Sequence, residues 1–170
     1  MNKRSMDVSP METNLNSRHP LDELDLQILG LLQEDSRLSY NKIASKLGIS
    51  VGTAYNRIKS LEEQGVVKCY TALLDASKIG YELTALILIQ AEGKHLVEVE
   101  NEVAGLSNVM AVYDITGDFD IAVIGRFKNR EGLNHFIKKL LAIPYIKRTV
   151  TNVVLNVVKE DPRIEIPKIS

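Results

Sequence analysis

The chain has 170 residues, of which 45% are hydrophobic and 25% are charged, and its formal net charge is −1. These values are typical of a soluble globular protein with one ordinary domain or two small ones. They exclude a protein that coats nucleic acid along its whole surface, which needs a large positive excess, but they allow a local basic patch.

The first predicted element is a helix that follows a polar tail. Residues 1–20 are rich in Ser and Asn and end in a His-Pro pair, so we interpret them as a flexible tail. The segment LDELDLQILGLLQED (21–35) repeats its apolar residues at helical spacing, and Asp22 can cap its start.

Two further helices are predicted at short spacing. Ser39 can cap a short helix that is expected to stop at Gly48, where the left-handed conformation favours glycine. Ser50 can cap a third helix, which ends at Gly65. Its inward stripe is Ala54, Ile58 and Leu61. Residues 21–65 therefore have the spacing of a helix-turn-helix domain.

From residue 66 the pattern changes to strands. Residues 66–80 are predicted to form an extended linker. Over 81–160 the order is strand, helix, strand, strand, helix, strand, which is the ferredoxin-like βαββαβ arrangement. The last strand is expected to be long, RTVTNVVLNVVK (148–159), and residues 161–170 form a Pro-interrupted tail.

The helix-turn-helix segment separates its charges. Residues 36–61 contain five cations and no Asp or Glu. These cations are Arg37, Lys42, Lys46, Arg57 and Lys59. A run of charge is usually a solvated face. Here the caps, the Gly turn, the missing anions and an Asn/Thr/Ser face occur together, so the segment predicts binding to double-stranded DNA.

The third helix is expected to turn a polar face outward. Helical geometry places Gly52, Asn56 and Ser60 on that face, and Asn can bond adenine through two hydrogen bonds. Gly52 has two possible explanations. It allows close approach to a phosphate or base, or a glycine is simply tolerated in the first turn of the helix, and both interpretations stay open. The predicted DNA-binding residues are Arg37, Ser39, Ser50, Gly52, Thr53, Tyr55, Asn56, Arg57, Lys59 and Ser60. Five cations contribute only modestly to DNA affinity, so a symmetric dimer that binds a near-palindromic site is expected.

The residues from LDELDLQILG to LLDASKIG resemble the amino-terminal half of the Lrp/AsnC (feast/famine) transcription regulators. ITGDFDIAV and IPYIKRTVTNVVL resemble their ligand-sensing half, so the likeness covers about residues 21–160. It implies an α+β fold with a winged-helix-like helix-turn-helix domain, a linker strand that pairs with the partner subunit, and a ferredoxin-like βαββαβ (RAM) domain. It also implies a homodimer and a higher oligomer such as an octamer. The 20-residue tail and the small run Gly52-Thr53-Ala54 depart from the family's usual pattern.

The resemblance further implies a pocket for an amino acid or a related small metabolite. The matching residues are Gly117, Asp118, Asp120, Thr149 and Thr151. The same residues also suit local roles, because Gly-Asp favours a hairpin corner and Thr favours strands. An architectural DNA-binding protein that ignores metabolites remains the alternative function.

No enzyme is predicted. His19, His95 and His135 are scattered, and no Ser-His-Asp set, P-loop or GxGxxG motif is present. Cys69 is the only cysteine, so no disulfide or metal pair is expected, and no cofactor is predicted. The longest apolar stretch, from Leu83, is too short to span a membrane, so a cytoplasmic protein without membrane contact is expected.

Overall fold

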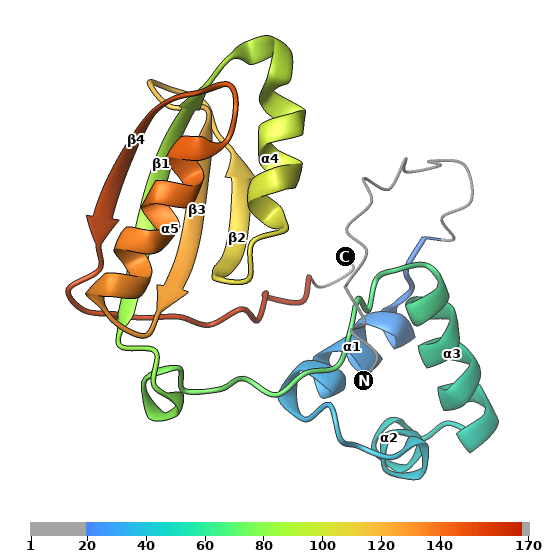
Figure 1. Cartoon of the computed structure of the whole chain (residues 1–170). Coiled ribbons are helices and arrows are strands. Elements are labelled where there is room, and N and C mark those ends of the chain that lie inside the picture. The colour runs from blue at the N-terminus through green and yellow to red at the C-terminus, as the bar shows by residue number, and fades with distance from the viewer. Residues whose placement is uncertain (1–19, 168–170) are drawn as a thin grey trace, which may run out of the picture. The chain divides into compact units, whose positions relative to one another are not determined.

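The computed structural model describes residues 20–167, which form two units (Figure 1). The first unit is helical and contains residues 20–72 together with 161–167. The second unit spans Leu73–Glu160. The predicted tail 1–20 lies outside the described residues except for Pro20. The segment after Glu160, predicted as a separate tail, groups with the helical unit.

The helical unit contains α1 (Glu23–Glu34), α2 (Tyr40–Leu47) and α3 (Val51–Glu63). The predicted caps are confirmed, because each helix follows a side chain that accepts a hydrogen bond from the N–H three residues later. These caps are Asp22, Ser39 and Ser50. Such caps satisfy N–H groups that have no partner within the helix.

The turn between α2 and α3 is the predicted one. Gly48 ends α2 with a φ of 67°, a left-handed conformation that disfavours other residues. Three residues separate the two helices, which is helix-turn-helix spacing. Their buried side chains pack with those of α1 into one core. Its fully buried members include Ile28, Ile43, Ala54, Ile58 and Leu61.

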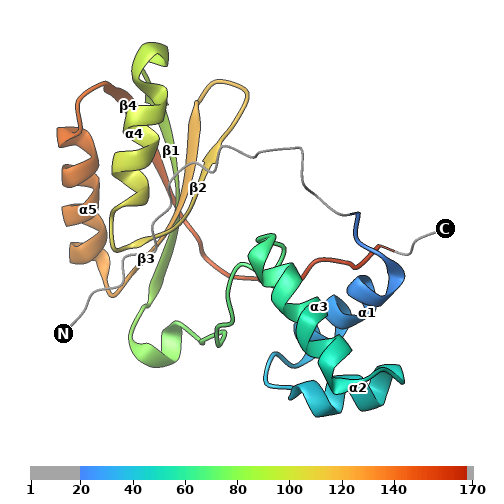
Figure 2. The same cartoon turned by 90° about the vertical axis from the view of Figure 1, so that its right-hand side faces the viewer.

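The second unit is an antiparallel sheet covered on one face. Its strands are β1 (Leu83–Ala91), β2 (Val109–Asp114), β3 (Ile121–Phe127) and β4 (Ile146–Val153), in the order β2-β3-β1-β4. Its helices are α4 (Leu96–Ala104) and α5 (Arg130–Ala142), and short 3₁₀ turns occupy Ser77–Ile79 and Gly93–His95. Both α-helices lie on the same face of the sheet (Figure 2). The ferredoxin-like prediction is confirmed.

The last strand is shorter than predicted. It was expected to run over 148–159, but β4 ends at Val153. The backbone N–H of Val154 donates to the carbonyl of Thr84 over 2.9 Å, and β1 begins one residue before Thr84. Beyond that point the neighbouring strand offers no ladder partner, so the β-branched residues that follow stay outside the sheet.

One position of β3 requires glycine because of close packing. Gly125 is paired with Ala85 on the face that the helices cover. A Cβ atom at this position would lie 2.9 Å from Cζ of Phe127, which is fully buried. The Phe127 ring packs 5.1 Å from the ring of Phe136 on α5. The ring therefore occupies the space that a side chain at 125 needs.

The predicted linker is extended and exposed. Residues 66–75 form no strand within the described part of the chain, and the side chains of Tyr70, Leu73 and Leu74 are exposed. A 3₁₀ turn follows, where the Asp75 carboxylate accepts from the N–H of Ser77 over 3.0 Å. The unpaired backbone and the exposed apolar side chains of this segment are compatible with strand pairing to a second copy.

Candidate nucleic-acid interface

An exposed stripe runs along α3. Gly52, Tyr55, Asn56 and Lys59 are all exposed, at spacings of three, four and seven residues. These spacings place residues on one face of a helix. The opposite face is fixed by the buried apolar side chains of the core. Compared with the predicted face, the exposed stripe includes Tyr55 fully, whereas Ser60 is half-buried.

The start of α3 is organised by two hydroxyls. The Oγ of Ser50 accepts from the N–H of Thr53 over 3.0 Å and shares a hydrogen bond with its Oγ1 over 2.8 Å. Both predicted DNA-binding hydroxyls therefore serve the cap. The first turn of α3 contains no acidic residue, and neither does that of α2, which Ser39 caps. Helix N-termini of this kind favour negatively charged phosphate.

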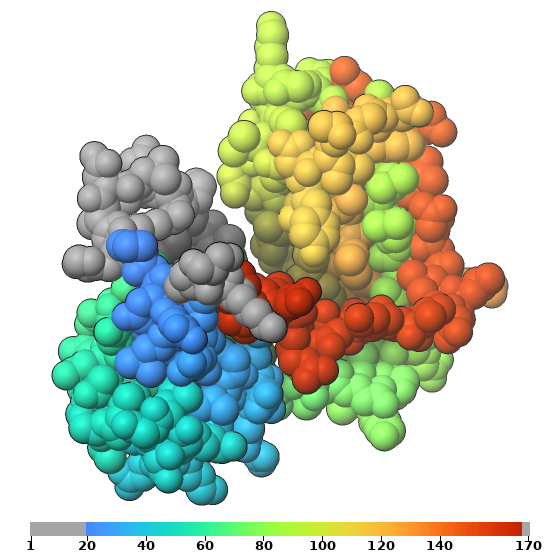
Figure 3. Space-filling model, turned by 180° about the vertical axis from the view of Figure 1, so that it is seen from behind, coloured from blue at the N-terminus to red at the C-terminus, as the bar shows by residue number. Residues whose placement is uncertain are grey.

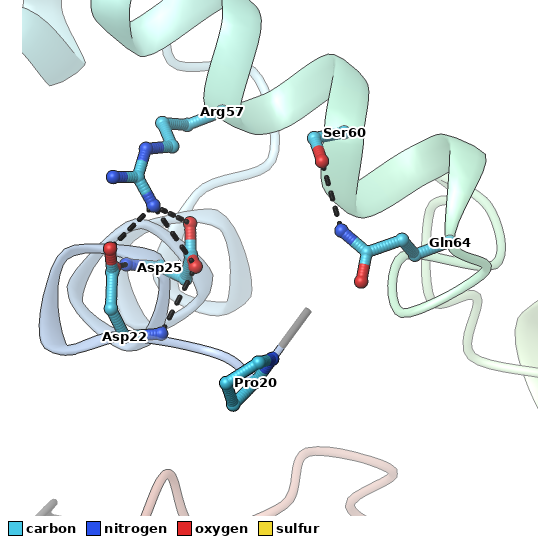
Figure 4. A pocket seen from close by; sticks show the side chains of 6 residues that line it. All are labelled: Pro20, Asp22, Asp25, Arg57, Ser60 and Gln64. Atoms are coloured by element: carbon cyan, nitrogen blue, oxygen red, sulfur yellow. Dashed lines mark hydrogen bonds and ion pairs between the residues drawn. The ribbon is translucent and has the colours of Figure 1, made fainter. Parts of the chain in front are cut away.

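Arg57 faces α1. Its Nη1 lies 2.6 Å from Oδ2 of Asp22 and 3.2 Å from Oδ1 of Asp25, as Figure 4 shows. Asp22 and Asp25 also bond each other's backbone N–H groups at the start of α1. These ion pairs compete with the predicted contact of Arg57 to phosphate or a base edge, which stays a prediction. Two carboxylates, one of them buried, hold the guanidinium against α1, while the Arg57 side chain stays partly exposed.

Ser60 lies on the same side as Arg57. Its hydroxyl accepts from Nε2 of Gln64 over 2.9 Å. An open hollow of about 350 Å³ lies here (Figure 4). It is lined by Pro20, Asp22, Asp25, Arg57, Ser60 and Gln64. DNA binding by Ser60 stays a prediction, although its side chain is half-buried and its hydroxyl already accepts from Gln64, the C-cap residue of α3.

The cations of the segment are less free than their number suggests. Arg37 pairs with Asp35 over 3.1 Å, and Lys59 pairs with Glu63 over 3.6 Å. Among residues 20–167, no acidic group lies within 4.0 Å of the side-chain nitrogens of Lys42 and Lys46 (two exposed residues of α2). Exposed pairs such as those of Arg37 and Lys59 are weak and can exchange their acid for phosphate.

A second tyrosine, Tyr40, lies beside the exposed stripe and contacts Tyr55. The rings of Tyr55 and Tyr40 meet edge to face with centroids 5.4 Å apart. Neither hydroxyl has a hydrogen-bond partner within the part of the chain that the structure describes, so both can donate to phosphate. Tyr70 differs, because its hydroxyl donates to Glu62 over 2.8 Å. Partial desolvation of the hydroxyl and this carboxylate raise the pKa of Tyr70, although much of its side chain is exposed.

The contacts of Asp22 predict acid sensitivity of the helical unit. The N–H of Asp25 and the Arg57 guanidinium hold the pKa of Asp22 below its ordinary value of 3.8. A depressed folded-state pKa adds stability above the unfolded value, and this stability is lost as pH falls through the folded pKa. The thermal unfolding temperature, measured by circular dichroism at a series of pH values, should therefore decrease as the pH is lowered below about 4. The decrease should be less steep in Asp22→Asn. Glu23→Gln is the control, and equal slopes in parent and Asp22→Asn contradict the expectation.

The predicted ligand residues lie near one end of the sheet. Gly117 has a φ of 123° in the β2–β3 turn, which confirms its corner role. Asp118 is exposed. Asp120 is an internal clamp, because its Oδ2 accepts from the N–H of Ala91 over 2.8 Å and its own N–H donates to Ile89 over 3.0 Å. Asp120 therefore has a structural role in the sheet, and its ligand-binding role stays a prediction.

The two threonines of β4 share a face, and it is the face that the helices cover. Thr149 pairs with Ile89 and Thr151 with Ile87, and both threonines are half-buried on this edge strand. Thr149, Ile89 and Ile121 lie in one row across the sheet. Two strand spacings of about 4.8 Å each therefore separate Thr149 from the start of β3.

Arg148 was not among the predicted ligand residues. Its guanidinium lies 5.5 Å from the ring centroid of Phe119, in the β2–β3 turn. The register pairs Arg148 with Gln90, so it occupies the face opposite to Thr149. Its position next to Thr149 in the sequence was the available signal, but the strand register was needed to bring it to the turn.

The comparisons with known proteins cover both units. Residues 21–68 match the winged helix-turn-helix DNA-binding family, and residues 84–164 match the Lrp/AsnC ligand binding domain. An HTH-type transcriptional regulator of Pyrococcus abyssi is 53% identical over 145 residues, which cover 85% of this chain and 99% of that protein. The chain belongs to the Lrp/AsnC family. It is a DNA-binding transcriptional regulator of this type, with a winged helix-turn-helix followed by the antiparallel sheet.

More distant members agree. The Lrp/AsnC chain is 36% identical to the regulator FL11 of Pyrococcus horikoshii over 149 residues, with 88% of this chain and 99% of FL11 covered. A transcriptional regulator of Neisseria meningitidis, solved in complex with L-Met, superposes with a TM-score of 0.78 at 26% identity over 86% of this chain and 97% of that one. Within residues 20–167 of this Lrp/AsnC chain, no helix has the length and apolarity to cross a membrane.

Proposed function

We propose that this regulator changes its DNA binding or its assembly when an amino acid or a related small metabolite binds its sheet unit. The observation that carries the proposal is the match of residues 84–164 to the Lrp/AsnC ligand binding domain. The L-Met complex of the similar Neisseria protein supports an amino-acid effector. A ligand that prefers one assembly or conformation shifts the population toward it.

The DNA contacts that we propose follow the exposed stripe of α3. Asn56 reads a base edge, while Tyr55, Lys59 and the two lysines of α2 contact phosphate. An added Cβ at Gly52 would meet only Ser50 Oγ at 3.8 Å, so packing within the unit does not require this glycine. That openness supports the reading in which Gly52 allows close approach of the DNA.

We further propose that two copies associate through the uncovered face of the sheet. The register places apolar side chains at its centre, and this is where a second copy can bury them. They are Leu86, Leu88, Ala111, Ala122, Ile124 and Val150. A twofold pair presents two helix-turn-helix units, which doubles the phosphate contacts and predicts a near-palindromic site.

Asp118→Ala is expected to abolish the effector response but to keep DNA affinity. The exposed carboxylate of Asp118 is the proposed partner of the ligand's ammonium group, and a hydrogen bond to a charged group contributes about 1.5–3 kcal/mol, or roughly 10- to 100-fold in affinity. Thermal-shift titration of the parent with each of the twenty amino acids identifies the ligand first. The same titration of Asp118→Ala then measures the loss, with Glu131→Ala on α5 as the control.

Two outcomes oppose the proposal. If Asp118→Ala retains the full thermal shift, the pocket lies elsewhere. If no amino acid shifts the parent's midpoint or its DNA affinity, the chain is an architectural DNA-binding protein that ignores metabolites. Binding of parent to duplex DNA is checked by titration at increasing potassium chloride, where the affinity must fall with salt.

A further inference from the structure

The side-chain amide of Gln33 pairs with the backbone of the C-terminal segment. Its Nε2 donates to the carbonyl of Ile164 over 2.9 Å, and the N–H of Ile164 donates to its Oε1 over 3.0 Å. The carboxamide thus offers the same donor and acceptor pair as a peptide group of a neighbouring strand. Figure 3 shows the C-terminal segment, in red, against the helical unit.

The two residues before Ile164 offer no free backbone N–H to Gln33. Arg163 bonds the Asp161 carboxylate through its backbone N–H over 3.1 Å and through its guanidinium over 3.0 and 2.9 Å. Pro162 and Pro167 have no N–H to offer. Sliding of this short segment toward its N-terminal side is therefore limited, because the N–H of Arg163 is engaged and Pro162 has none.

We propose that Gln33 is the docking point for the chain's own C-terminal segment, and that this contact is a second tether between the two units. Ile164 follows Val153, the last residue of β4, by 11 residues. An extended chain of this length reaches about 40 Å. The other connection, from Glu63 to Leu83, is 20 residues long and reaches about 70 Å. The docked segment therefore sets the tighter limit on separation of the units.

The tether has a consequence for DNA binding, and this part rests on the proposed twofold regulator. When one helical unit of a dimer is bound, the other meets its half-site at an effective concentration that depends on the length of its connections. Release of the C-terminal segment loosens that connection. Affinity for a duplex with two half-sites should then fall, whereas affinity for a single half-site should not change.

The experiment compares Gln33→Ala with Gln27→Ala in the full chain. Gln27 is an exposed residue of α1 whose side chain makes no hydrogen bond within residues 20–167. Amide hydrogen exchange of Ile164 is expected to be about 10-fold faster in Gln33→Ala and unchanged in Gln27→Ala, since the mutation removes its hydrogen-bond acceptor. A chain that ends at Glu160 provides a second way to remove the tether.

DNA titration completes the test. Gln33→Ala and the shortened chain should bind the two-half-site duplex about 3- to 10-fold more weakly and the half-site duplex as well as the parent does. Equal losses on both duplexes, or Ile164 exchange as fast in the parent as in Gln33→Ala, would overturn the tether. A parent that binds neither duplex refutes the proposed DNA function and the tether's effect on it, while Ile164 exchange still decides whether the segment is docked.

Discussion

Asn56→Ala is expected to weaken binding to the cognate duplex by about 10- to 100-fold and to leave the unfolding midpoint unchanged. Asn56 is exposed on the α3 stripe, and its side chain has no hydrogen-bond partner within the described residues. Its carboxamide can therefore face a base edge at no cost to the fold. Fluorescence anisotropy on a duplex selected from genomic fragments measures the change, and circular dichroism measures the midpoint.

The matched control for this variant is Asn134→Ala, an exposed asparagine on α5 of the sheet unit. It should alter neither property. A variant at position 56 that binds the selected duplex as tightly as the parent contradicts the assignment of the α3 stripe as the reading face. A loss of affinity accompanied by a lower midpoint would instead show that Asn56 supports the fold.

Arg57→Ala is expected to destabilise the helical unit by about 1–2 kcal/mol, which lowers its unfolding midpoint by roughly 5–10 °C. The substitution leaves the buried Asp25 carboxylate without the guanidinium at 3.2 Å. The expected value lies below that of a fully buried pair because the Arg57 side chain is 38% exposed. The folded protein should keep its DNA affinity to within about threefold, since Arg57 does not lie on the exposed stripe.

Lys59→Ala is the comparison, because Lys59 is also an α3 cation with an acidic partner, but an exposed one. Its effect on the unfolding free energy should stay below about 0.5 kcal/mol, while its DNA affinity should fall. If Arg57→Ala melts like the parent and binds DNA poorly, Arg57 is a DNA contact, as the sequence alone suggested. Thermal melts and anisotropy on the same samples separate the two cases.

The parts that were predictable from sequence are those encoded within a few residues. Ser39, Ser50 and Gly48 determine where α2 and α3 begin or end, and the interactions involved span three or four positions. The alternating and helical spacings of the apolar residues predicted the order of strands and helices in the sheet unit for the same reason. Local patterns therefore predicted the fold class, the ends of α3 to within one or two residues, and the buried face of α3.

The parts that were not predictable depend on pairs that are distant in the chain. Arg57 is engaged by carboxylates 32 and 35 positions away, and Asp120 by a backbone N–H 29 positions away. Gln33 binds a peptide group 131 positions away. The length of β4 depended on where its neighbour β1 begins. No periodicity signals such pairs, because they arise only when the elements pack.

The crowding at Gly125 constrains how this sheet can vary among related chains. Since the Phe127 ring fills the space where a side chain at 125 would stand, the two positions are not independent. A larger residue at 125 becomes tolerable only when 127 shrinks, so the double change costs less than its separate steps add up to. In homologues we therefore expect the pair to change together, from glycine at 125 and an aromatic residue at 127 to a small residue at 125 and an aliphatic residue at 127. Covariation of the two positions would show that they share the same volume under α5.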